Sequence, residues 1–246
     1  MDYENSFKDF FIETKHGRIH YRRHKSESGK SLVLIHGMAS STLTWKRLVE
    51  KFPESLDICM IDLLGHGSSD SPEIDYKVRI QTEILKEVFE AEKIRSPYLM
   101  GHSYGGWVCA EFARKNSASG LILEDSGGLK VFYEEIKGDK NREDYKKKML
   151  EKVLELDAKK HVMENILNDQ FREGELDDKT LSEIKIPSLI IWGGEDRIIS
   201  IRYALLFSEL LPDSRLEIIK NARHTPHYSN PGDVSEIILE FIKEHP

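Results

Sequence analysis

Gly101-His102-Ser103-Tyr104-Gly105-Gly106 is the stretch of sequence that decides the fold. The apolar run Tyr98–Met100 comes directly before it, and the helical pattern Tyr104–Lys115 begins inside it. A Gly-x-Ser-x-Gly sequence between a strand and a helix is typical of a nucleophile elbow, although the bare pattern also occurs in ordinary loops. Such a turn exposes the serine hydroxyl, and the first N–H groups of the next helix point at the same place. We therefore predict that Ser103 is a nucleophile and that the backbone N–H of Tyr104 stabilises an oxyanion.

Short apolar runs recur on both sides of this turn and alternate with helical patterns. The predicted strands are Lys8–Thr14, Gly17–Arg23, Leu32–Ile35, Leu56–Ile61, Tyr98–Met100, Gly120–Leu123, Ser188–Trp192 and Arg215–Ile219. The clearest helical patterns are Asp75–Glu92, Tyr104–Lys115, Ser200–Leu211 and Asp233–Glu244. Strands this short and apolar, with helices between them, indicate a mostly parallel sheet that is covered on both faces. The prediction is an α/β fold with a doubly wound sheet that starts with an antiparallel hairpin.

The segment from Leu129 to Glu183 breaks this alternation. It contains no convincing strand, and it combines dense charge with apolar residues at helical spacing. We predict a helical insertion at residues 129–183, between the two parts of one core domain, residues 1–128 and 184–246. The alternative is that these helices form an ordinary surface layer of the core.

A second turn, His36-Gly37-Met38, follows the predicted strand Leu32–Ile35. Gly37 allows the chain to turn back toward the elbow, which makes the backbone N–H of Met38 the candidate for a second oxyanion donor. The alternative is a plain turn that ends the strand. We expect His36 to shape this loop and to take no part in the chemistry.

A carboxylate and a histidine follow the last two predicted strands. Asp196 ends the turn Trp192-Gly193-Gly194-Glu195-Asp196, and His224 lies in the loop after Arg215–Ile219. Open α/β sheets place their sites at this rim, where a carboxylate can orient a histidine that acts as a base toward serine. The order Ser, Asp, His along the chain is the order expected for this architecture. The competing residues are Glu195 and Asp125 for the acid and His227 for the base.

Composition excludes some partners. The net charge of -7 argues against nucleic acid, because phosphate binding needs clustered Lys and Arg. The two cysteines, Cys59 and Cys109, lie in apolar segments, which fits a reducing compartment. The first residues have no signal-peptide pattern, and no apolar run approaches the roughly 18 residues of a membrane span. We expect a cytoplasmic protein that acts on a small molecule without metal, cofactor or membrane partner, and composition leaves the oligomeric state open.

Together these motifs resemble the α/β-hydrolase superfamily over nearly the whole chain. The elbow and the Trp-Gly-Gly-Glu-Asp turn match the family pattern, and 62–69 looks like the loop that supports the wall of the family's active site. The resemblance implies that the insertion at 129–183 is a cap over the substrate. Two positions depart from the pattern. Arg223 stands where relatives usually have glycine, and Ser229 stands where they often have glutamate.

The expected reaction is hydrolysis of a small carboxylic ester through an acyl-enzyme intermediate, with Ser103, His224 and Asp196 as the triad. Serine at the elbow, where an aspartate would otherwise stand, argues against haloalkane dehalogenase and epoxide hydrolase activity. Two alternatives stay open: a C–C bond hydrolase that acts on a ring-cleavage product, and a non-catalytic binding module of the same fold. The candidate pocket residues, for which a core position is the alternative, are Trp45, Trp107, Phe132 and Tyr133.

Overall fold

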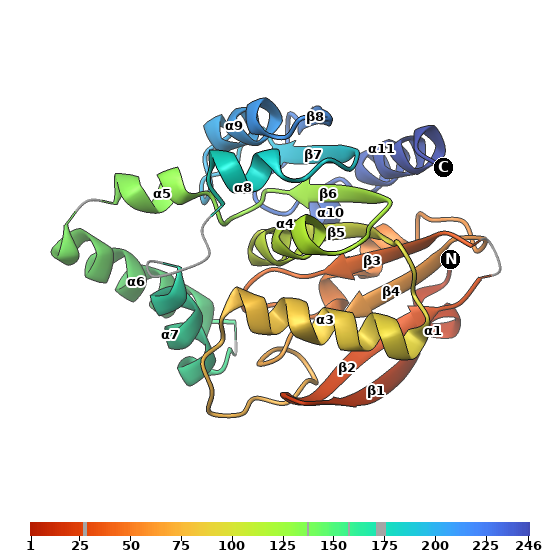
Figure 1. Ribbon diagram of the computed structural model, residues 1–246, viewed down its shortest axis with the longest axis horizontal. Coiled ribbons are helices and arrows are strands. Elements are labelled where there is room, and N and C mark those ends of the chain that lie inside the picture. Colours follow the sequence, from red (N-terminus) through yellow and green to blue (C-terminus); the bar gives the residue numbers. More distant parts are fainter. Residues whose placement is uncertain (27–28, 137, 157, 171–175) are drawn as a thin grey trace.

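The computed structural model describes residues 1–26, 29–136, 138–156, 158–170 and 176–246 (Figure 1). An eight-stranded sheet runs through its centre in the order β1-β2-β4-β3-β5-β6-β7-β8. The strands are β1 (Lys8–Thr14), β2 (Gly17–His24), β3 (Ser31–Ile35), β4 (Asp57–Ile61), β5 (Tyr98–His102), β6 (Gly120–Glu124), β7 (Ser188–Gly193) and β8 (Ser214–Ile219). Strand β2 pairs antiparallel with β1 and β4, and the other neighbours are parallel. The predicted fold class is confirmed.

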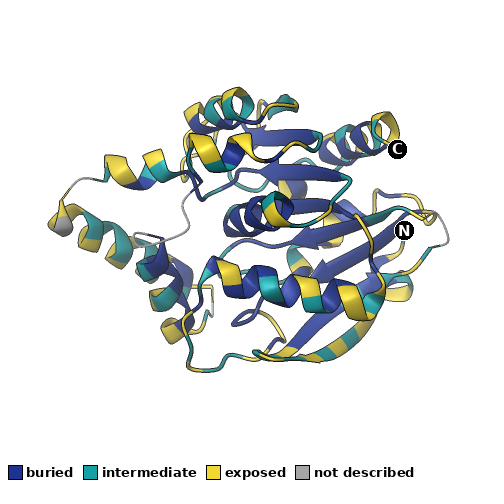
Figure 2. Cartoon of the chain, in the orientation of Figure 1, coloured by how far each residue is buried: buried dark blue, intermediate teal, exposed yellow. Residues whose placement is uncertain are grey.

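Helices cover both faces of the sheet. On one face lie α3 (Val78–Glu92), α4 (Tyr104–Lys115), α8 (Asp178–Ser182) and α9 (Arg202–Leu210). On the other face lie α1 (Tyr3–Ser6), η1 (Thr42–Trp45), α2 (Lys46–Val49), α10 (Pro226–Ser229) and α11 (Pro231–Glu244). The result is a sandwich of helices, sheet and helices in which the central strands are buried on both sides (Figure 2).

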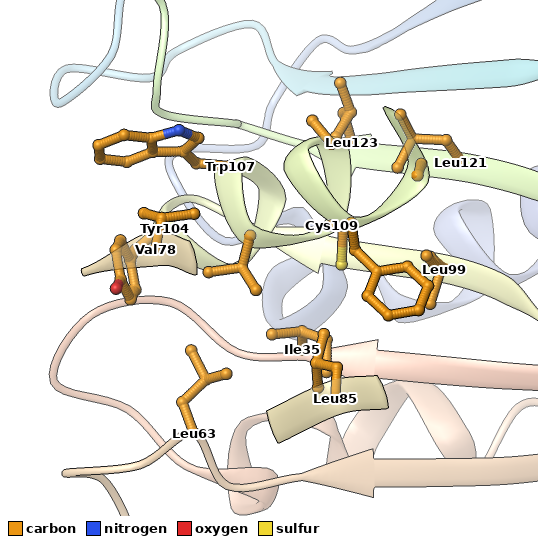
Figure 3. Packing of buried hydrophobic residues seen from close by; sticks show 14 of the residues in the cluster. Ile35, Leu63, Val78, Leu85, Leu99, Tyr104, Trp107, Cys109, Leu121 and Leu123 are labelled. Carbon is orange, nitrogen blue, oxygen red and sulfur yellow. The ribbon is translucent and has the colours of Figure 1, made fainter. Parts of the chain in front are cut away.

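Alternation along the strands explains the two cores. In β3, Val33 and Ile35 face the α3 and α4 layer, whereas Leu32 and Leu34 face the α2 and α11 layer. All four side chains are fully buried, so each strand reads as a continuous apolar run. In the first core, strand residues from β3, β5 and β6 pack against side chains of α3 and α4 (Figure 3).

Between β6 and β7 the chain forms α5 (Lys130–Glu135), α6 (Asp139–Leu154), α7 (Lys160–Asp169) and α8. Helices α5 to α7 project beyond the carboxyl ends of the parallel strands, whereas α8 lies beside α4 and α9 (Figure 1). The predicted insertion at 129–183 therefore contains three projecting helices and one that lies on the core. Residues 137, 157 and 171–175 of it are outside the described residues. Among the described residues, no helix has the length and apolar character needed to cross a membrane.

More than half of the predicted element ends coincide with the structure, and the others differ by one to three residues. The strand expected at Tyr98–Met100 continues through Gly101 and His102, which pair with Leu123 and Glu124 of β6. Hydrophobicity does not predict that these two residues belong to a strand. Backbone hydrogen bonding to β6 holds them in the sheet. The helix expected from Asp75 begins at Val78.

Candidate active site

Ser103 lies on a tight turn between β5 and α4. Its backbone has φ 52° and ψ -115°, a conformation that non-glycine residues rarely adopt. The turn is held by the Ser103 N–H, which donates to the Glu124 carbonyl at 2.9 Å, and by the Gly127 N–H, which donates to the Ser103 carbonyl at 3.0 Å. A Cβ atom at Gly105 would lie 2.3 Å from the carbonyl oxygen of Ile35. The glycine therefore allows the elbow to pack directly on the end of β3.

Ser103, His224 and Asp196 form a chain of hydrogen bonds. Ser103 Oγ lies 3.1 Å from His224 Nε2, and His224 Nδ1 lies 2.7 Å from Asp196 Oδ2. The carboxylate can only accept, so Nδ1 carries a proton and Nε2 has a free lone pair that accepts the serine proton. The Asp196 side chain is fully buried, and its other oxygen accepts the N–H groups of Ile198 and Ile199 at 2.7 and 3.1 Å. The residues predicted from sequence are thus brought together with the geometry of a nucleophile, a base and an orienting acid.

The competing acids occupy other positions. Glu195 is exposed on the turn. Asp125 is buried beneath the site, and one of its oxygens accepts the Gly193 N–H at 2.9 Å. Burial and the nearby Glu124 and Asp196 carboxylates raise the pKa of Asp125 well above its ordinary value. A carboxyl group whose charged form is disfavoured is a weaker partner for a histidine that must become positively charged.

The loop after β3 lies against the elbow. A Cβ atom at Gly37 would lie 3.3 Å from Cβ of Ser103, and Met38 and Tyr104 line the same pocket as the serine. Within the described residues, neither the Met38 nor the Tyr104 N–H donates a backbone hydrogen bond, so both are available to a ligand. His36 is fully buried, donates from Nδ1 to the Gly37 carbonyl at 2.7 Å and accepts the Leu63 N–H at 3.1 Å. Its contacts shape the loop.

Sequence reasoning missed a buried network behind the triad. Glu124 and His227 are fully buried, and Glu124 accepts both the His227 N–H at 2.7 Å and the His227 Nδ1 proton. The other ring nitrogen of His227 accepts from the Thr44 hydroxyl at 2.8 Å. His102 donates from Nε2 to the His224 carbonyl at 2.6 Å. The last residues of β5 and β6 therefore hold the loop that carries His224. Glu124 and Thr44 engage both ring nitrogens of His227, the competing base.

Two groups in this region have the residue types of metal ligands. The ligand atoms of His102, Glu124 and His227 lie within 4.8 Å of one another, and so do those of His102, Asp125 and His224. Hydrogen bonds within the protein already engage both ring nitrogens of His224 and of His227. These contacts account for the clusters as hydrogen-bonding networks.

A cleft surrounds Ser103 and has two unequal sides. On one side is an enclosed pocket of about 40 Å³, lined by Tyr104 and by aromatic side chains. On the other is an open groove of about 970 Å³, lined by His224. Three of the four candidate pocket aromatics, Trp107, Phe132 and Tyr133, line the enclosed pocket. Trp45 packs in the core, with its ring centre 4.4 Å from that of His227.

Comparison with known proteins agrees with this geometry. Residues 32–237 match the Alpha/beta hydrolase family. The chain belongs to this family. It is 25% identical to Lipase 1 of Psychrobacter immobilis, over 92% of this chain and 82% of the lipase. Its structure is similar to that of MenH from S. aureus (TM-score 0.76, 25% identity, 92% and 98% of the two chains covered). It also resembles an esterase from Exiguobacterium antarcticum (TM-score 0.78, 19% identity, 96% and 100% covered).

The family supports the activity of a hydrolase. The two departures from the family pattern, Arg223 and Ser229, both lie in or beside the loop that carries His224. Arg223 is exposed, and its side chain borders the groove, while its carbonyl oxygen packs on Gly193. Ser229 ends α10 and bonds to Asn230 and to the Thr225 carbonyl. Neither change disturbs the hydrogen bonds of the hydrolase's Ser103, His224 and Asp196.

Proposed function

We propose that this hydrolase cleaves a carboxylic ester with Ser103 as nucleophile, His224 as general base and Asp196 as the acid that orients His224. The observation that carries the proposal is the continuous chain of hydrogen bonds from Ser103 Oγ through His224 to the buried carboxylate of Asp196. The strained elbow supports it, because the unfavourable backbone angles present the hydroxyl to the cleft.

In this mechanism, Ser103 Oγ attacks the ester carbonyl carbon while His224 Nε2 takes the hydroxyl proton. The N–H groups of Met38 and Tyr104 stabilise the resulting oxyanion, and removal of one such donor typically costs about 2.7–4 kcal/mol. The C–O bond then breaks, and protonated His224 gives its proton to the leaving oxygen. Water, activated by the same histidine, attacks the acyl-enzyme and releases the acid.

The projecting helices α5 to α7 serve as a cap over the cleft in this proposal. Phe132 and Tyr133 of α5 and Tyr145 and Met149 of α6 line the enclosed pocket. About 40 Å³ of the pocket is accessible to the centre of a water-sized sphere, and one water needs roughly 10–15 Å³ of such volume. The pocket therefore has room for only a short acyl group. We expect acetate and butyrate esters to be better substrates than decanoate esters.

The test is hydrolysis of a 4-nitrophenyl ester series from acetate to decanoate, together with labelling by a serine-directed phosphonate. Ser103→Ala should abolish both. The matched control is Ser235→Ala, which removes a buried hydroxyl of α11 that donates to the Gly232 carbonyl at 2.8 Å and lines neither the pocket nor the groove. Asp196→Asn should lower kcat by about 10³–10⁴-fold, because the amide favours the wrong tautomer of His224.

Other results would redirect the assignment. Labelling of Ser103 without hydrolysis of any ester would favour a C–C bond hydrolase. The absence of both labelling and turnover would favour a binding module and refute the enzyme assignment.

A further inference from the structure

The two sides of the cleft have different chemical roles in ester hydrolysis. His224 lines the open groove and does not line the enclosed pocket, whereas Ser103 lies on the border and lines both. Protonated His224 must reach the leaving oxygen, because that oxygen departs with its proton. The leaving group therefore lies in the groove, and the acyl group lies in the pocket.

The lysine and arginine side chains described along the groove contrast with the acidic composition of the chain. Among the described residues that line it are three cations, Lys152, Lys159 and Arg223, and no carboxylate. The whole chain has a net charge of -7. Lys159 donates to the neutral hydroxyl of Ser71, and none of the three forms an ion pair with a described carboxylate. Three charges of one sign, with no ion pair to a carboxylate in the described part of the chain, favour an anion beside the reactive serine.

The groove also exposes large apolar side chains. Leu43, Leu156 and Tyr228 line it and are 64%, 63% and 49% exposed. The guanidinium of Arg47 stacks over the Tyr228 ring at 4.2 Å, which brings a fourth cation to the same edge. An apolar surface bordered by cations is complementary to a molecule that has an apolar body and a negative charge.

One of these cations is a departure from the family pattern. Arg223 precedes His224 directly, at a position where relatives usually have glycine. Its backbone carbonyl packs closely against Gly193, and the residue lines the groove.

We propose that the substrate is an ester of a short acid whose leaving group is an anionic amphiphile, with a carboxylate, phosphate or sulfate held by Lys152, Lys159 and Arg223. This inference rests on the proposed ester hydrolysis and specifies its substrate. The bond that forms joins Ser103 Oγ to the acyl carbon, and the bond that breaks is the ester C–O bond. The leaving oxygen takes the proton from His224, and the anionic group contributes binding only.

The test compares esters that differ only in charge. On the leaving-group side the pair is 4-acetoxybenzoate and the neutral 4-acetoxybenzamide. On the acyl side the pair is 4-nitrophenyl hemisuccinate and the neutral 4-nitrophenyl succinamate. Each variant is measured with the same pair, so the intrinsic reactivity of the esters cancels from the comparison.

The charge-reversal variants are Lys152→Glu and Arg223→Glu. The control is Lys147→Glu, which lies on α6 with Lys152 but about 140° around the helix and does not line the groove. We expect each groove variant to lower the kcat/KM ratio of 4-acetoxybenzoate to 4-acetoxybenzamide by about 3–10-fold, and the control to change it by less than about twofold. Raising the salt concentration should lower the wild-type ratio as well.

An unchanged ratio in both groove variants would overturn the inference while leaving ester hydrolysis in place. Sensitivity of the hemisuccinate pair alone would also overturn it, because the acyl group would then occupy the groove. Absence of all ester turnover, without phosphonate labelling of Ser103, would remove the proposed function and this inference with it.

Discussion

Replacement of Glu124 by leucine should destabilise the protein and displace His224. Glu124 is fully buried and accepts two hydrogen bonds from His227, which is also fully buried. Leucine is similar in size but cannot accept, so two buried donors lose their partner. Each unpaired buried donor costs about 1–3 kcal/mol, which gives an expected loss of about 2–6 kcal/mol in the free energy of unfolding.

Glutamine at the same position provides the matched comparison. Its amide oxygen can accept the His227 N–H while its amide NH₂ donates to Nδ1 of the other tautomer. Nε2 of that tautomer then donates to the Thr44 hydroxyl, which at present donates to it. Every partner is retained, so Glu124→Gln should lose only about 0.5–1.5 kcal/mol.

The assay is urea unfolding of both variants followed by circular dichroism, with ester kinetics measured alongside. In Glu124→Leu we expect kcat to fall by about 10²-fold with a smaller change in KM, because a displacement of about 1 Å at a catalytic group has an effect of that size. Equal stability of the leucine and glutamine variants, or a loss below about 0.5 kcal/mol for leucine, would refute the reasoning.

Three further predictions concern the elbow, acid stability and the acyl pocket. Gly105→Ala should cost at least about 3 kcal/mol by urea unfolding, because the new Cβ would lie 2.3 Å from the Ile35 carbonyl and 2.5 Å from the His36 carbonyl. Burial is the main cause that lowers the pKa of His66 to about 3, so between about pH 6.5 and pH 3 the unfolded chain binds a proton that the folded protein does not. Stability should therefore fall as the pH drops toward 3, and His66→Gln should reduce that slope by up to about 1.4 kcal/mol per pH unit in unfolding curves at several pH values. Phe132→Ala should shift the ester preference toward longer acyl chains, and an unchanged chain-length profile would contradict the proposed position of the acyl group.

The helices, the strands and the meeting of Ser103, Asp196 and His224 could be anticipated because their sequence signals are local. The apolar run of β3 predicts a buried strand, and the glycines around Ser103 predict a tight turn. Each pattern depends only on a few consecutive residues. The chain order of a parallel sheet then brings the carboxyl ends of β5, β7 and β8 to one edge, so residues more than 90 positions apart could be placed together. The topology of the sheet alone implies that these residues lie close together.

The buried network could not be anticipated in the same way. Glu124 ends an apolar strand and His227 follows a proline, and neither residue has a neighbour in sequence that indicates a partner. Their contact forms only because the fold places α10 next to the end of β6. A charged residue at the end of an otherwise apolar strand is the available signal, because burial of a carboxylate requires a hydrogen-bonding partner nearby.

The cations of the groove could not be recognised from the sequence, so the proposed substrate class depends on the structure. Lys152 and Lys159 lie in a segment so rich in charge that no single lysine stands out in the sequence, and Arg223 is recognisable there only as a departure from a family pattern. The fold brings these residues from α6, from the residue before α7 and from the β8 loop to one side of Ser103. Under the proposed ester hydrolysis, the catalytic groups follow from what acyl transfer requires of any substrate. The residues around the groove are free of that requirement, so under the same proposal their charge is matched to the molecule that binds there.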